Sequence, residues 1–121
     1  MFGINPKKLI LEYGSNEEVD TSLKNKDLTY IASEIDSYYL SVSNNNITIL
    51  GKDSDSCFYG LSTLEMIFNQ TDNNIKELEI KDYSDSKYRG FIEGYYGIPW
   101  TSEERKELMR FGSKFKSNIY I

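Results

Sequence analysis

The chain has 121 residues and a formal net charge of −5 at pH 7, with 39% hydrophobic and 27% charged residues. This length suits one modest domain, and the composition is typical of a globular chain. The acidic charge argues against a nucleic-acid partner, because nucleic-acid recognition depends on Lys and Arg. No apolar run approaches the length that spans a bilayer. With no histidine and a single cysteine, His-dependent catalysis, internal disulfides and Cys-cluster metal sites are excluded.

The first predicted element is the apolar run Leu9-Ile10-Leu11, which predicts a strand buried on both faces. No hairpin partner lies next to it in the sequence, so we expect this domain to have earlier elements upstream. The following residues are mostly polar, and a short helix is predicted through Val19 and Leu23.

A hairpin is the clearest local signal of the chain. In residues 38–43, Tyr38, Leu40 and Val42 alternate with more polar neighbours, which predicts a half-exposed strand. The run of asparagines at 44–46 suits a tight turn, and strand character resumes at 47–50.

A helix is predicted next, with Asp53 or Ser54 as its cap. Its apolar stripe consists of Cys57, Leu61, Leu64 and Phe68, widened by Phe58 and Ile67. Gly60 interrupts it and indicates close approach to a sheet. The stripe suits a core better than a partner surface, and Cys57 suits a buried residue better than a nucleophile.

The polar stretch 82–87 predicts a boundary between two domains, residues 1–86 and residues 87–121. Before it, Leu78 and Ile80 alternate with glutamates in a strand with one apolar face. After it we expect a strand, a loop, a helix and a final strand at 118–121. Such a unit cannot bury both faces of its strands alone, so the chain is interpreted as a fragment of a larger α/β fold.

The stretch from Tyr88 to Trp100, YRGFIEGYYGIPW, is the feature around which the chain is organised. It starts as a strand, breaks at Gly94, and is followed by Thr101 and Glu104 in the spacing of a helix capping box. Loops at the carboxyl ends of strands often carry the sites of α/β proteins. The aromatic residues of this loop suit either the faces of a sugar ring or packing against a helix.

The run Arg89 to Trp100, the Glu-Arg helix start and the final Asn118-Ile119-Tyr120-Ile121 resemble glycoside hydrolase family 84, the β-N-acetylglucosaminidases that include bacterial hyaluronidase-like enzymes. Tyr95 stands where Phe is more usual. The resemblance covers most of residues 37–121 and is weaker before residue 37. It implies an α+β fold: a small hexosaminidase-type domain, with a helix on one face of its sheet, followed by the truncated start of a (β/α)8 barrel.

In this family the 2-acetamido oxygen of the substrate attacks the anomeric carbon and gives an oxazoline. Two adjacent aspartates assist, and no cofactor takes part. The resemblance implies that this pair lies beyond residue 121, so the chain alone is expected to hold no catalytic residue and to be inactive. Gly94 matches the glycine whose carbonyl accepts from a sugar hydroxyl, and Tyr96 matches an aromatic on the leaving-group side. Glu93 is either a ligand contact or a structural acceptor.

The expected partners of the whole protein are N-acetylglucosamine-containing glycans or glycoproteins, with no nucleic acid and no membrane span. The resemblance implies a secreted or cell-surface protein, although no signal peptide precedes Pro6. Two alternatives stay open. One is a fragment of a family 20 hexosaminidase, whose first barrel strand leads into an Asp-containing segment instead. The other is a non-catalytic carbohydrate-binding or scaffold module.

Overall fold

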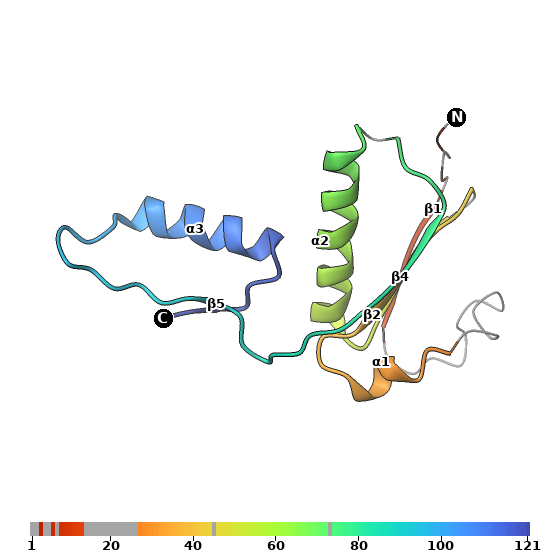
Figure 1. Ribbon diagram of the computed structural model, residues 1–121, viewed down its shortest axis with the longest axis horizontal. Helices are drawn as coiled ribbons and strands as arrows, with labels where there is room; N and C mark the ends of the chain where they lie inside the picture. Colours follow the sequence, from red (N-terminus) through yellow and green to blue (C-terminus); the bar gives the residue numbers. More distant parts are fainter. Residues whose placement is uncertain (1–2, 4–5, 7, 14–26, 45, 73) are drawn as a thin grey trace. The chain divides into compact units, whose positions relative to one another are not determined.

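The computed structural model describes residues 3, 6, 8–13, 27–44, 46–72 and 74–121. The chain forms two compact units, residues 1–85 and residues 86–121 (Figure 1). The helix predicted through Val19 and Leu23 lies outside the described residues.

The first unit contains a four-stranded sheet in the order β1-β3-β2-β4. Its strands are β1 (Lys8–Tyr13), β2 (Tyr38–Val42), β3 (Asn46–Gly51) and β4 (Leu78–Asp82). β2 and β3 pair antiparallel, which confirms the predicted hairpin. β1 pairs parallel with β3, and β4 pairs antiparallel with β2. The exposure alternates along β4, and Leu78 and Ile80 are partly buried against the core, which confirms a strand with one apolar face.

Helix α2 (Ser54–Gln70) covers one face of this sheet (Figure 1). Its N-cap is Asp53, whose Oδ1 accepts from the backbone N–H of Ser56 at 2.8 Å, and its C-cap is Thr71. A Cβ at Gly60 would lie 2.6 Å from Cγ2 of Ile49 and 3.3 Å from Cδ2 of Tyr38. The glycine therefore lets the helix approach the sheet closely, as its place in the sequence indicated.

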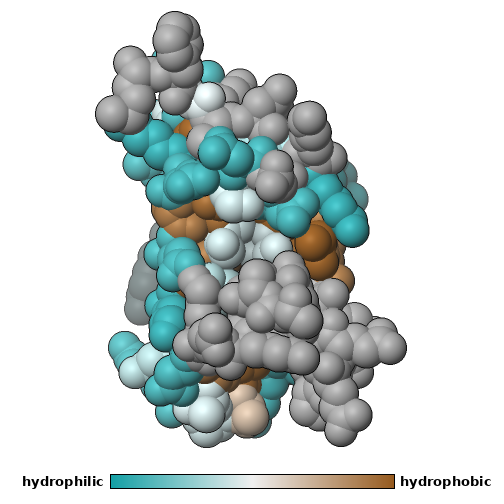
Figure 2. Space-filling view, turned by 90° about the vertical axis from the view of Figure 1, so that its right-hand side faces the viewer, coloured by the Kyte–Doolittle hydropathy of each residue, from teal (hydrophilic) through white to brown (hydrophobic). Residues whose placement is uncertain are grey.

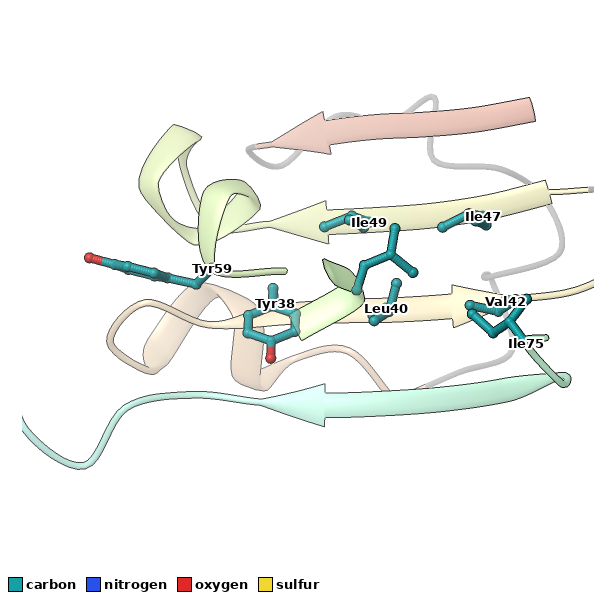
Figure 3. Packing of buried hydrophobic residues seen from close by; sticks show 8 residues of the cluster. Tyr38, Leu40, Val42, Ile47, Ile49, Tyr59 and Ile75 are labelled. Atoms are coloured by element: carbon teal, nitrogen blue, oxygen red, sulfur yellow. The ribbon is translucent and has the colours of Figure 1, made fainter. Parts of the chain in front are cut away.

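The core of the unit lies between α2 and the sheet (Figure 3). Its buried residues are Tyr38, Leu40, Val42, Ile47, Ile49, Tyr59, Leu64 and Ile75. Tyr38 also joins three elements through its hydroxyl, which donates to Asp82 Oδ2 of β4 at 2.6 Å and lies 2.6 Å from the Thr63 hydroxyl of α2. Leu64 lies in this core, and Leu61, Ile67 and Phe68 pack against it, so most of the predicted stripe of α2 faces the core.

The opposite face of the sheet is covered in part by the segment that carries helix α1 (Tyr30–Ser33). Ile31, Tyr39 and Leu50 form a second buried cluster there. The expectation of a half-exposed strand at 38–42 is therefore wrong. Tyr39 is fully buried, because side chains on the second face of β2 also meet a covering element.

Two other burial expectations are wrong as well. Leu9 and Leu11 are about half exposed (50% and 47%) although both faces of their strand were expected to be buried. β1 is an edge strand, and α2 contacts it less than it contacts β2 and β3. In α2, Phe58 is exposed and Tyr59 is buried in its place, because the face that meets the sheet includes Gly60. Cys57 is buried, as predicted.

The surface seen from the right-hand side of Figure 1 mixes hydrophobic and hydrophilic residues. Its visible brown areas are separated from one another by white and teal ones (Figure 2). Among the described residues, no helix has both the length and the apolar character that crossing a membrane requires.

The second unit is a strand, a helix and a strand. β5 (Gly90–Phe91) pairs parallel with β6 (Ile119–Tyr120), and α3 (Ser102–Lys114) connects them. A Cβ at Gly90 would lie 1.8 Å from the carbonyl oxygen of Ile119, so this strand pairing requires glycine at that position. Arg89 supports the same pairing, since its backbone N–H donates to Asn118 Oδ1 at 2.9 Å.

We predict that Gly60→Ala destabilises the first unit. The added methyl group would overlap the side chain of Ile49, which is fully buried. Overpacking of this kind costs more than Ala gains in helix propensity, so we expect a net loss of about 1–2 kcal/mol. Urea unfolding, followed by near-ultraviolet circular dichroism of the buried tyrosines, measures it.

The matched control is Asn69→Ala, an exposed position on the same helix, which should change the stability by less than about 0.5 kcal/mol. An unchanged unfolding midpoint for Gly60→Ala would mean that the side chain of Ile49 makes room for the methyl group without a loss of stability, and would contradict the prediction.

Candidate functional site

The candidate site is the loop of residues 94–100, which follows the carboxyl end of β5 and is here called the aromatic loop. It ends at Thr101, the N-cap of α3. The Thr101 side chain accepts from the Glu104 N–H at 3.3 Å, and the Glu104 carboxylate accepts from the Thr101 N–H at 2.6 Å. The predicted capping box is thus confirmed, and it fixes the point at which the loop becomes helix.

The loop itself presents its side chains to solvent. Tyr96 is fully exposed, and Tyr95 and Ile98 are mostly exposed. Together with Glu93 and the loop glycines they line an open hollow of about 240 Å³. A Cβ at Gly94 would meet no atom within 4 Å, so packing within the chain does not require glycine there. The structure thus places the two predicted binding residues, Gly94 and Tyr96, on the same exposed loop beside one hollow.

Trp100 lines the same hollow as Tyr95 and Tyr96, and a second hollow as well. It is 48% exposed, and it lines a hollow of about 360 Å³ with Leu108 and Phe111 of α3. Trp100 therefore borders both the loop hollow and α3, so neither interpretation of the aromatic residues is excluded for it. The exposed faces of Tyr95 and Tyr96 remain open to a ligand.

Glu93, the last residue before the loop, is held by groups from two other elements. Its Oε2 and Oε1 accept from Nε and Nη2 of Arg105, both at 2.7 Å. The Tyr120 hydroxyl donates to Oε2 as well. The backbone N–H of Glu93 donates to the carbonyl of Ile121 at 2.7 Å. The Glu93 side chain is only 9% exposed, so these contacts place it as a structural acceptor.

These hydrogen bonds stabilise the charged form of Glu93. Donation from Arg105 first, and then from Tyr120, lowers the pKa of Glu93 from 4.5 to about 2. The same contact raises the pKa of Tyr120. Glu93 is therefore a carboxylate at neutral pH with both oxygens occupied, which does not suit a general acid. Among the described residues, no group of three or more metal-ligating side chains is gathered in one place.

Arg105 and Tyr120 were not predicted as partners of Glu93. Arg105 is 12 residues and Tyr120 is 27 residues from Glu93. A signal was nevertheless present. A strand that ends in a carboxylate, followed by a helix with an arginine in its first turn, brings opposite charges to the same end of a parallel unit.

Comparisons with known proteins match both units. Residues 89–121 match the family described as beta-N-acetylglucosaminidase, and residues 4–83 match the family described as glycosyl hydrolase family 20, domain 2. The structure described as "Structure of CpGH84D" is similar, with a TM-score of 0.81 and 45% identity. That match covers 99% of this chain and 21% of the solved one.

Two curated proteins match over a shorter range. "Protein O-GlcNAcase" of Rattus norvegicus and of Mus musculus are each 50% identical over 32 residues, which are 26% of this chain. The matched residues are only 4% of each of those proteins.

We predict that acid weakens the second unit through Glu93. The folded pKa, about 2, is lower than the ordinary value of 4.5, so the unfolded state binds the proton more tightly. The stability contributed by Glu93 is therefore fully present above about pH 4.5 and is lost as the pH falls toward about 2. Urea unfolding between about pH 7 and pH 2.5, followed by the fluorescence of the single tryptophan, Trp100, measures this loss.

Glu93→Gln is the comparison. We expect its unfolding midpoint to be lower at neutral pH and to change less with acid. Glu104, whose pKa is also lowered by hydrogen bonds with Thr101, titrates in both proteins, so the difference between them isolates Glu93. Parallel pH curves for the two proteins would refute the prediction.

Proposed function

From its membership in glycoside hydrolase family 84, we propose that this chain is a segment of a retaining β-N-acetylglucosaminidase. Its residues 4–83 belong to the family described as glycosyl hydrolase family 20, domain 2. The observation that carries this proposal is local. The residues that match the beta-N-acetylglucosaminidase family, 89–121, are those that build the strand, the aromatic loop, the helix and the second strand.

The second unit is then the first repeat of a (β/α)8 barrel, and the boundary falls near residue 86. The parallel pairing of β5 with β6 and the helix between them support this assignment. The aromatic loop follows the carboxyl end of β5, and barrel enzymes build their active sites from such loops. The exposed side chains Phe111 and Phe115 of α3 are the apolar surface that further elements of a barrel would cover.

In this proposal the aromatic loop contributes binding and no acid or base. The carbonyl of Gly94 accepts a hydrogen bond from a sugar hydroxyl, and the open space around Gly94 supports such an approach. Tyr96 lies on the leaving-group side, where its exposed ring offers a flat apolar face to a sugar or peptide.

The chemistry depends on the substrate's own acetamido group. Its oxygen attacks the anomeric carbon, the bond to the leaving oxygen breaks as that oxygen gains a proton, and an oxazoline forms. Water then opens the oxazoline with retention of configuration. An Asp pair outside residues 1–121 orients the acetamido group and transfers the protons. Glu93 has both oxygens committed, which supports the proposal that the chain by itself is inactive.

The substrate class follows from the same proposal. N-acetylglucosamine-containing glycans or glycoproteins are the expected substrates, and the name of the two rodent relatives, protein O-GlcNAcase, fits a glycoprotein. Export of the whole protein to the cell surface or medium is also a proposal. A segment of a family 20 hexosaminidase is the weaker alternative, because the match to the CpGH84D structure covers both units.

A non-catalytic sugar-binding module is the second candidate function, supported by the match of residues 4–83 to a domain that is separate from the catalytic family model. Titration of the 121-residue chain with N-acetylglucosamine, followed by amide chemical shifts, separates the two. Shifts confined to the first unit would favour the module, and shifts in the aromatic loop would favour the glycosidase.

We predict that this chain does not hydrolyse a chromogenic β-N-acetylglucosaminide, and that the product of the same gene read past the codon for Ile121 does. An adjacent Asp pair shortly after Ile121 is the expected sequence. A stop codon at that point, or an inactive longer protein that carries the pair, would overturn the glycosidase proposal.

In the longer protein, Tyr96→Ala should lower kcat/KM by up to about tenfold, as expected for the loss of one aromatic contact. Tyr88→Ala is the matched control, because Tyr88 is also an exposed tyrosine of the second unit but lies outside the aromatic loop. Equal effects of the two substitutions would remove Tyr96 from the site.

A further inference from the structure

Hydrogen bonds connect both ends of the aromatic loop to the start of α3. At the carboxyl end, Thr101 is joined to Glu104 by the capping box. At the amino end, Glu93 is joined to Arg105, the residue next to Glu104, by two hydrogen bonds of 2.7 Å. Glu93 also accepts from the Tyr120 hydroxyl of β6, and its own N–H donates to the carbonyl of Ile121, the residue after β6. We call Glu93, Arg105 and Tyr120 the Glu93 anchor.

Between these two sets of hydrogen bonds, the loop has few packing contacts. Tyr95, Tyr96 and Ile98 are more than half exposed, and no atom comes within 4 Å of a Cβ built at Gly94 or Gly97. A segment with so few buried contacts takes its position from its ends. Gly94 follows Glu93 directly, so the anchor determines where the loop leaves the strand.

We propose that Arg105 and Tyr120 are positioning residues, which hold Glu93 and thereby hold Gly94 and the aromatic loop in one conformation for the sugar. The identity of the ligand rests on the proposed function. The positioning itself rests only on the contacts within the second unit.

The geometry of the anchor favours positioning over simple charge neutralisation. The arginine fork meets both carboxylate oxygens side-on and fixes the plane of the carboxylate, whereas a lysine would supply the charge without that plane. The Tyr120 hydroxyl adds a third donor from a different element. Arg105→Lys therefore separates the two roles, because it retains the charge and removes the fork.

Trp100 is a built-in probe of this loop, since it is the only tryptophan in the chain and is 48% exposed. We expect Arg105→Lys in the 121-residue chain to shift its emission to the red and to raise its acrylamide quenching constant by up to about twofold, toward full exposure. Tyr120→Phe should produce a smaller change of the same sign. The double variant with Glu93→Gln should add little to Arg105→Lys alone, because both act through one contact.

The matched control is Glu103→Gln. It removes the ion pair between Glu103 and Lys106 on the same helix, at 2.7 Å, without touching the anchor, and it should leave Trp100 unchanged. Gly112→Ala is the control for general damage, since its Cβ would lie 2.5 Å from Cε2 of Phe91, away from the loop.

The proposal is overturned if Arg105→Lys and Tyr120→Phe both fold and their Trp100 emission and quenching constant are unchanged, like those of Glu103→Gln. It is also overturned if Gly112→Ala, at an equal loss of stability, changes the Trp100 emission and quenching constant as much as the two anchor variants do. Should Arg105→Lys unfold the unit, Tyr120→Phe decides, because phenylalanine retains the ring. None of these outcomes depends on hydrolysis, so failure of the positioning proposal is distinguishable from failure of the glycosidase proposal.

Discussion

The Glu93 carboxylate is the point at which the elements of the second unit are held together. The residue follows β5 by two positions, and it accepts from α3 through Arg105 and from β6 through Tyr120. A carboxylate with so little exposure needs donors for both oxygens, and here the donors come from the two elements that the strand must meet. One buried charge thus specifies the assembly of strand, helix and strand, and the aromatic loop begins at its next residue.

The first unit is held together in a comparable way by a tyrosine. Tyr38 joins β2, β4 and α2 through one hydroxyl, and the close approach of α2 at Gly60 brings the helix onto the same ring. In each unit, then, a polar group at or just beyond the end of a strand joins the helix to the strands. Apolar burial supplies most of the stabilisation, and the polar group supplies the register.

Features with local causes could be predicted from the sequence. The capping box of Thr101 and Glu104, the cap at Asp53 and the hairpin pairing of β2 with β3 each depend on residues close in sequence, and all three are present. Burial could not be predicted as well, because it depends on which element lies opposite. Leu9 lies on an edge and Tyr39 meets a second covering segment, and neither fact is visible in the alternation of the strands. The partners of Glu93 were missed for the same reason.

The burial of Cys57 has a consequence for the reactivity of the chain. This side chain is 7% exposed in the first turns of α2, and burial raises the pKa of its thiol, which suppresses the thiolate that oxidants and alkylating reagents attack. Since it is the only cysteine, its modification requires the helix to leave the sheet. The rate at which a thiol reagent modifies Cys57 therefore reports how often the first unit opens.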